Sequence, residues 1–199
     1  MHAVVATSWG GPEVLEWQEL PDLEPRAGEV RVRVEAAGVR VAGLSIVGGW
    51  AEQLLARADD LVRVPEEIES ATAACLVMGG VGAWQMLHRV AEVRPGCRVL
   101  VHGATGGVGT AATQLARLAG AEVFGTARAG DEAVLEGHSI QRMRAAHPEW
   151  FKADLGTLLQ MTAERIHRPH VSRTFALSEA RLTVEALARG ERGKFVLLA

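Results

Sequence analysis

The first third of the chain alternates hydrophobic and polar residues, a pattern typical of half-buried β-strands. In 29–39, EVRVRVEAAGV places Val30, Val32 and Val34 on one face and charged side chains on the other. Shorter apolar or alternating runs at 3–7 and 14–20 are separated by glycine and proline. Several short strands in succession predict a small barrel or sandwich.

From Ser70 the hydrophobic period becomes helical. Apolar residues recur three or four positions apart up to Met78, and again from Val81 after the pair Gly79–Gly80. A helix over 108–118 is predicted to bury Val108, Ala111, Ala112, Leu115 and Leu118. A helix starting at Pro148 is predicted to bury Phe151, Leu155, Leu158, Leu159, Thr162 and Ile166.

The end of the chain has recognisable helix boundaries. Ser178 is a good N-cap for a last helix, and Gly190 is a good residue to end it. The closing residues, KFVLLA, are predicted to form a strand.

The stretch 97–127 predicts a βαβ unit. A buried strand at 97–104 leads through a glycine-rich turn into the helix at 108–118, and 121–127 is the second strand. Residues 132–139 are a candidate third strand. In the turn, Gly103, Gly106, Gly107 and Gly109 would let backbone N–H groups approach a pyrophosphate at the helix N-terminus. The same glycines would also permit close strand–helix packing, so the turn indicates the fold more strongly than a bound cofactor.

At these residues the chain resembles the zinc-independent quinone oxidoreductase and enoyl reductase branch of the medium-chain dehydrogenase/reductase superfamily. VRPGCRVLVHGATGGVGTAATQLARLAGAEVFGTARAG is similar to the start of that family's nucleotide domain. GGPEVLEWQELPDLEPRAGEVRVRVEAAGV resembles the strands of its GroES-like barrel, and RTFALSEARLTVEALARGERGKFVLLA resembles its C-terminal ending.

Against that family, two internal blocks are missing. Val39 runs straight into Arg40, and a second block is absent after GTARAG. We therefore expect an α/β protein: a truncated GroES-like β-barrel remnant plus a reduced Rossmann-like βαβ unit of about three strands. The barrel remnant would comprise residues 1–75 and 171–199, and the nucleotide-domain remnant residues 76–170. The resemblance also implies a homodimer, because the family's strand similar to 132–139 pairs across a dimer axis.

The missing blocks would remove most of the surface that holds a nicotinamide, so we expect no cofactor. Gly82 stands where the family has a threonine that approaches the nicotinamide, which widens the pocket. NADPH remains the alternative cofactor, held by the four turn glycines and by Arg128 at a 2′-phosphate. Zinc is not expected, because Arg40 stands where zinc-dependent relatives carry a cysteine. His138, His147, His167 and His170 also lack the spacing of a catalytic metal site.

Three functions remain open. The leading hypothesis is a redox-inactive enzyme that performs a pericyclic-type cyclisation or isomerisation of a hydrophobic, unsaturated, polyketide-like small molecule. The alternative is an NADPH-dependent quinone oxidoreductase or enoyl reductase that reduces an activated C=C bond, and the third is a non-catalytic dimeric scaffold. Candidate pocket residues are Trp50, Glu52, Met78, Gly82, Trp84, His102 and His138.

Composition and charge limit the binding partners and the location that we expect for the protein. The net charge is −3 without a basic block, so neither nucleic acid nor an anionic membrane is expected as a partner. The N-terminus has no signal-peptide pattern, and no stretch is expected to span a membrane. The cysteines, Cys75 and Cys97, are predicted to be reduced thiols of a cytoplasmic protein.

Overall fold

The structure, a computed structural model, describes residues 1–39, 49–126, 147–191 and 193–199. The chain divides into two compact units: unit 1 comprises Met1–Leu61 and Val171–Ala199, and unit 2 comprises Val62–His170. The first boundary lies earlier than the expected break after residue 75. The difference arises because Ile68 belongs to the core of unit 2, and Val62 and Ala73 pack against that core.

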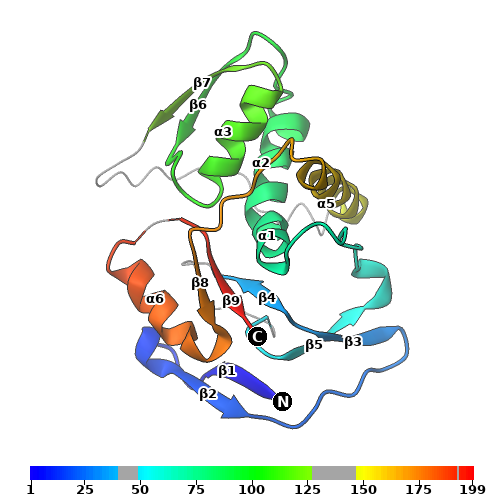
Figure 1. The fold of residues 1–199 in the computed structure, drawn as a ribbon, viewed down its shortest axis with the longest axis vertical. Coiled ribbons are helices and arrows are strands. Elements are labelled where there is room, and N and C mark those ends of the chain that lie inside the picture. Colours follow the sequence, from blue (N-terminus) through cyan, green and yellow to red (C-terminus); the bar gives the residue numbers. More distant parts are fainter. Residues whose placement is uncertain (40–48, 127–146, 192) are drawn as a thin grey trace. The chain divides into compact units, whose positions relative to one another are not determined.

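Unit 1 is built from small open sheets (Figure 1). β1 (His2–Ala6) pairs antiparallel with β2 (Leu15–Glu19), and β3 (Glu29–Arg33) pairs antiparallel with β5 (Gln53–Arg57). In a third sheet, β9 (Phe195–Leu198) lies between β4 (Ala36–Gly38) and β8 (Arg173–Ala176). Within the described residues these sheets do not close into a barrel, which agrees with the expected barrel remnant.

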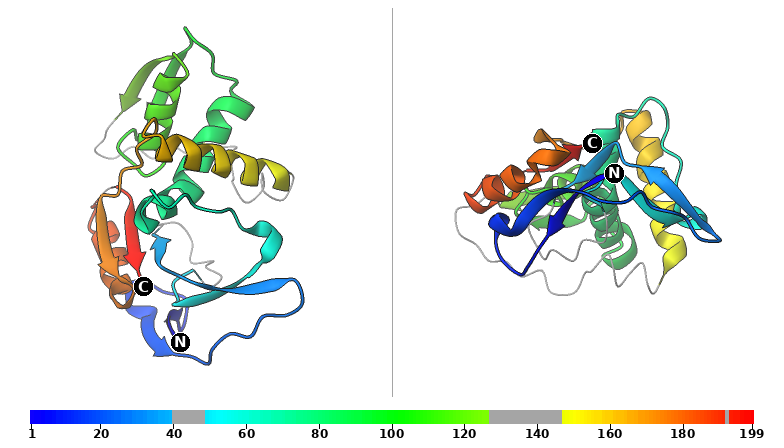
Figure 2. Two further views of the ribbon diagram at one scale, coloured as in Figure 1. Left: turned by 45° about the vertical axis from the view of Figure 1, so that its right-hand side comes forward. Right: turned by 90° about the horizontal axis from the view of Figure 1, so that it is seen from below.

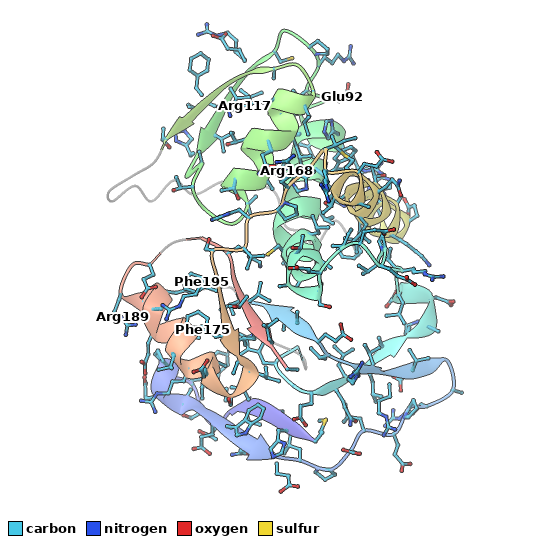
Figure 3. The ribbon with its side chains drawn as sticks, in the orientation of Figure 1. Glu92, Arg117, Arg168, Phe175, Arg189 and Phe195 are labelled. Atoms are coloured by element: carbon cyan, nitrogen blue, oxygen red, sulfur yellow. The ribbon has the colours of Figure 1, made fainter. Side chains whose placement is uncertain are left out.

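The core of unit 1 lies beside α6 (Ala180–Ala188). Phe175 and Phe195, on neighbouring strands, pack with ring centroids 5.6 Å apart (Figure 3). The predicted N-cap at Ser178 is wrong, because the Glu179 carboxylate caps the preceding turn by accepting the Ala176 N–H at 2.9 Å. The predicted helix end at Gly190 is confirmed, with φ of +92° just past the helix.

Unit 2 contains one continuous helical run, Ser70–Val90, which continues through the pair Gly79–Gly80. It consists of α1 (Ser70–Cys75), a π-helical segment Leu76–Gly80, α2 (Val81–Trp84) and a second π-helical segment, Gln85–Val90. By length and composition alone the run is able to cross a membrane, contrary to expectation. Half of its apolar window is buried inside the protein, where Leu76, Val81 and Leu87 belong to the core.

The predicted βαβ unit is present. β6 (Arg98–His102) pairs in parallel with β7 (Glu122–Thr126), and α3 (Gly109–Leu118) connects them and covers one face (Figure 1). The candidate third strand, 132–139, lies outside the described residues. The central residues of the predicted apolar face of α3 are buried. Its two ends were predicted wrongly: Val108 and Leu118 are 41% and 50% exposed because they lie beyond the packed middle of the helix.

The last helix of unit 2, α5 (Pro148–Ala163), packs against the helical run (Figure 2). Leu155, Leu158 and Leu159 are buried as predicted. Ile166 was predicted on the same face but is exposed, because the helix has ended at Ala163. The segment after it is tied to α3 by Gln114, whose side-chain amide exchanges hydrogen bonds of 3.1 and 3.2 Å with the backbone of Arg168 (Figure 3).

Candidate functional site

The glycine-rich turn between β6 and α3 is held by hydrogen bonds to the end of β7. Gly103 has a φ of +68°, a conformation that favours glycine. Its N–H donates to Thr126 Oγ1 at 3.2 Å, and the Ala104 N–H donates to the Thr126 carbonyl at 2.9 Å. The Gly106 N–H closes the turn on the Gly103 carbonyl at 2.9 Å. The turn is therefore ordered by the protein's own contacts.

Packing requires glycine at two positions: Gly109, where the turn meets α3, and Gly79, which lies against the turn. A Cβ on Gly109 would overlap the Gly103 carbonyl oxygen and lie 2.8 Å from the Ala104 Cα. A Cβ on Gly79, in the first π-helical segment, would lie 2.5 Å from the Gly107 carbonyl oxygen. Backbone atoms cannot yield as a flexible side chain can, so a larger residue at either position would displace the turn. These glycines are explained without a ligand.

The turn also fits one part of a dinucleotide. It leads into α3, and an anion is favoured at the N-terminal end of a helix. The N–H groups of Thr110 and Ala112 already donate to the carbonyls of Gly106 and Val108, so an anion would rely on the other amides of this end. A pyrophosphate would be held there by turn amides, as the sequence resemblance implies. Arg128, the candidate contact to a 2′-phosphate, lies outside the described residues. A phosphate group at the turn would therefore not depend on the parts of a cofactor site that hold the adenine and the nicotinamide.

A side chain at position 82 would meet no neighbouring atom of the described residues. The residue is buried in α2, yet no atom of the described residues lies within 4 Å of a Cβ built on it, apart from its own helix backbone and chain neighbours. By contrast, a Cβ on nearby Gly80 would contact Leu76 and Leu158 at 3.2 and 3.4 Å. That glycine at position 82 widens a pocket stays a prediction.

One turn along the run, Gln85 is part of a buried polar network. Its Nε2 donates to Asp154 Oδ2 of α5 at 3.0 Å. Arg89 donates hydrogen bonds to the same carboxylate. Its Nε lies 3.0 Å from Oδ1 and 2.9 Å from Oδ2, and its Nη2 lies 2.6 Å from Oδ1. The Oε1 atom of Gln85 is buried and has no hydrogen-bond partner. Since an unpaired buried carbonyl is costly, this atom stands out in an otherwise satisfied network.

Aromatic rings border the network. The Arg89 guanidinium lies 4.5 Å from the centre of the Trp150 ring, which stacks on His147 at 3.7 Å. Trp84, a candidate pocket residue, packs on His88 with ring centroids 4.2 Å apart. Burial lowers the pKa of His88, and the nearby Asp154 carboxylate opposes that shift. His88 is therefore biased towards the neutral form.

The remaining candidates fall into three groups. Met78 is half-buried against the core of unit 2, and His102 is exposed at the end of β6, with Nδ1 3.2 Å from Thr126 Oγ1. Trp50 and Glu52 lie in unit 1. Trp50 is a buried core residue, and Glu52 accepts the His2 backbone N–H at 2.6 Å. That hydrogen bond lowers the pKa of Glu52 despite partial desolvation. His138 lies outside the described residues.

Sequence reasoning missed Gln85, Arg89 and Asp154. A signal was present for Asp154, which falls between Phe151 and Leu158 at helical spacing on the apolar face of α5. An acidic residue at such a position indicates a buried partner. Separately, the described part of the chain contains no group of three or more His, Cys, Asp or Glu side chains placed to hold a metal.

Comparison of the fold identifies its class. A probable oxidoreductase from Mycobacterium abscessus superposes with a TM-score of 0.87 at 21% identity, covering 100% of this chain and 99% of that one. CurK enoyl reductase gives 0.85 at 17% identity, with 99% and 98% covered. CurF ER cyclopropanase from the curacin A biosynthetic pathway gives 0.80 at 18% identity, also with 99% and 98% covered. The chain has the medium-chain dehydrogenase/reductase fold, and the resemblance seen in the sequence is confirmed at this level.

Sequence relatives are polyketide synthases. A mycocerosic acid synthase-like polyketide synthase of Mycobacterium tuberculosis is 36% identical over 139 residues, which cover 63% of this chain and 7% of that protein. The chain spans less than a tenth of the length of the curated relatives that it matches first. No family model matches the chain.

Proposed function

We propose that this protein is an enzyme acting on a hydrophobic, unsaturated, polyketide-type small molecule, and that it catalyses a non-redox, pericyclic-type cyclisation or isomerisation. The fold and the polyketide synthase relatives support an enzyme of polyketide chemistry. A rearrangement of this type redistributes bonds within one molecule and transfers no hydride. Its main requirement is a cavity that holds the reactive conformer.

The observation that carries the proposal is buried Gly82, where a Cβ would meet no atom of the described residues within 4 Å, apart from its own helix backbone and chain neighbours. In the resemblance, this position approaches the nicotinamide, and the threonine hydroxyl and methyl expected there are missing. Within the turn, Gly109 is meanwhile accounted for by contacts with backbone atoms of the protein, and Gly103 by its φ of +68°. Retention of these two glycines therefore does not require a dinucleotide, and the loss of the threonine side chain favours a substrate over a cofactor ring.

The second candidate is NADPH-dependent reduction of a quinone or an activated C=C bond. It is favoured by the intact glycine turn at the start of α3, where a pyrophosphate fits. Bound NADPH would supply a hydride, and the chain's contribution would be to hold the phosphates and exclude water.

The deciding experiment has two parts. Purified protein is titrated with NADPH and NADH while cofactor fluorescence and melting temperature are followed. It is then incubated with the N-acetylcysteamine thioester of a linear conjugated polyene, and the product mass is measured. The proposal expects no binding at about millimolar cofactor and a product of unchanged mass. Binding near micromolar Kd with a product that has gained two hydrogens would establish the reductase instead.

The variant Gly82→Thr distinguishes the non-redox enzyme from the reductase. Threonine adds a side chain at the position that the proposal gives to the substrate, so it is expected to abolish the mass-neutral conversion. A reductase would keep or improve its NADPH affinity when this side chain is present. Gly156→Thr is the matched control, because a Cβ on Gly156 of α5 also meets no atom of the described residues within 4 Å.

A further inference from the structure

The chain leaves unit 2 through a short segment, Glu164–His170, which follows the end of α5, and unit 1 resumes directly after it. The segment begins with a tight turn in which the Arg165 N–H donates to the Thr162 carbonyl at 3.0 Å. Arg165 occupies the left-handed position of this turn, with φ of +60°, where glycine is the usual residue. Such a strained conformation persists only where the surrounding structure holds it.

Two hydrogen bonds and one buried side chain hold the segment in place. The Gln114 side chain of α3 donates to the Arg168 carbonyl at 3.1 Å and accepts the Arg168 N–H at 3.2 Å. A turn of this kind frequently buries the hydrophobic residue that follows the left-handed position, but Ile166 is 49% exposed. His167 is buried instead, at 1% exposed, so an ionisable side chain takes the place of an apolar one.

The hydrogen bonds around His167 decide which ring nitrogen carries the hydrogen. Thr162 Oγ1 donates to the Leu158 carbonyl at 2.8 Å and lies 3.5 Å from His167 Nδ1. Since the hydroxyl has one hydrogen and the carbonyl takes it, Nδ1 is the donor towards Oγ1. Nε2 is then the bare nitrogen of the neutral ring, and it is buried without a hydrogen-bond partner among the described residues. Protonation of the buried ring would therefore add an N–H with no acceptor there.

No charged side chain of the described residues offsets the cost of a buried imidazolium at this place. Burial is the one cause that lowers the pKa of His167. Residues 155–163 of α5 include no ionisable side chain. The ionisable side chains of the segment and of α3 near Gln114 are all exposed: Arg117, Glu164, Arg165, Arg168 and His170. Protonation is therefore favourable only after His167 has left its buried position.

We propose that His167 is a pH-sensitive anchor: in mild acid its protonated ring leaves the interior of unit 2, and the segment Glu164–His170 separates from α3 while the helices of unit 2 stay folded. Opening relieves the strain at Arg165 and exchanges the bonds to Gln114 for bonds to water. Unfolding of α5 would instead expose its buried leucines, which costs more. After opening, the connection from unit 2 to unit 1 is no longer tied to α3.

The test is backbone amide hydrogen exchange of the purified full chain, followed by NMR at several pH values and at low urea concentrations. Each rate is expressed relative to that of an unstructured chain under the same conditions. The Arg168 N–H reports on the bond to Gln114, and its protection should fall about tenfold per pH unit below the ordinary histidine pKa of about 6.5. Its protection should be insensitive to urea, because a local opening exposes little surface, whereas that of the Leu158 N–H inside α5 should fall steeply with urea.

Two variants assign the effect to one histidine. His167→Gln keeps a polar side chain that binds no proton, and should make the protection of the Arg168 N–H independent of pH. His170→Gln changes an exposed neighbour and should keep the wild-type dependence. Circular dichroism verifies folding, and the wild type compared with His170→Gln decides the question even where His167→Gln does not fold. A wild-type Arg168 N–H that ignores pH, a urea dependence as steep as that of Leu158, or an unchanged pH dependence in folded His167→Gln would overturn the proposal.

Discussion

Arg89 and Asp154 form a two-point ion pair that joins the helical run Ser70–Val90 to α5. Arg89 Nη2 lies 2.6 Å from Asp154 Oδ1, and Nε lies 2.9 Å from Oδ2. The side chain of Asp154 is 3% exposed, whereas that of Arg89 is 29% exposed. The carboxylate is thus the buried partner, and it depends on the guanidinium for most of its hydrogen bonds.

Replacing the guanidinium should destabilise unit 2. Arg89→Met leaves a buried carboxylate with Gln85 as its remaining donor among the described residues, and we expect a loss of about 3 kcal/mol in the free energy of unfolding. Urea unfolding followed by tryptophan fluorescence measures it. Arg98→Met removes an exposed pair with Glu122, 3.2 Å apart, and should change stability little. Equal effects of the two changes would contradict the importance assigned to the buried pair.

The glycine turn makes a second prediction about stability. Gly109→Ala places a Cβ against the backbone of Gly103 and Ala104, and should cost about 2 kcal/mol. Gly156→Ala, where the Cβ meets no described atom, should gain about 0.5 kcal/mol from helix propensity. Both values come from denaturant titration without any nucleotide. If Gly109→Ala were neutral, packing would no longer explain this glycine.

Stability should fall in mild acid because of His167. Burial lowers the pKa of this histidine, whose Nε2 has no partner and whose side chain is fully enclosed. The unfolded chain therefore binds a proton more readily than the folded chain. The stability that this group contributes is complete above the ordinary histidine pKa of about 6.5 and is lost as pH falls below it.

The measurement is the melting temperature from about pH 8 to about pH 5. His167→Gln should flatten part of the decline, and the rest belongs in part to His88, whose pKa burial also lowers. His170→Gln is the control, since it changes a neighbouring histidine. A profile of His167→Gln that parallels the wild type would show that His167 binds protons equally in the folded and unfolded chain, which would contradict a pKa lowered by burial.

The homodimer expected from sequence is a further prediction. In the described residues, Leu100 and Phe124 lie opposite one another on β6 and β7 and are 57% and 42% exposed. Parallel strands are ordinarily buried on both faces, so these exposed side chains favour contact with a second copy of the chain. Sedimentation velocity should give twice the 21.2 kDa of one chain, and Leu100→Glu should shift the protein towards the monomer. A wild-type monomer at all concentrations would refute it.

The order and type of most elements could be read from the sequence, because they depend on local periodicity. Alternating valines marked β3, and the glycine-rich turn between an apolar run and an amphipathic stretch marked β6 and α3. Gly190 marked the end of α6. β8 was not predicted as a separate strand, because four residues are too few to establish a period.

The sequence by itself determined the glycine turn and the absence of a side chain at position 82, which follow from residue type and spacing, and its resemblance to a family implied the fold class. Only the tertiary structure brought Gln85 and Arg89 to Asp154, separated by 69 and 65 positions in the chain. Tertiary packing also decided that Trp50 is a core residue and that Gly109 must lack a Cβ. Such contacts depend on how elements pack in three dimensions, and no local pattern encodes the distance between them.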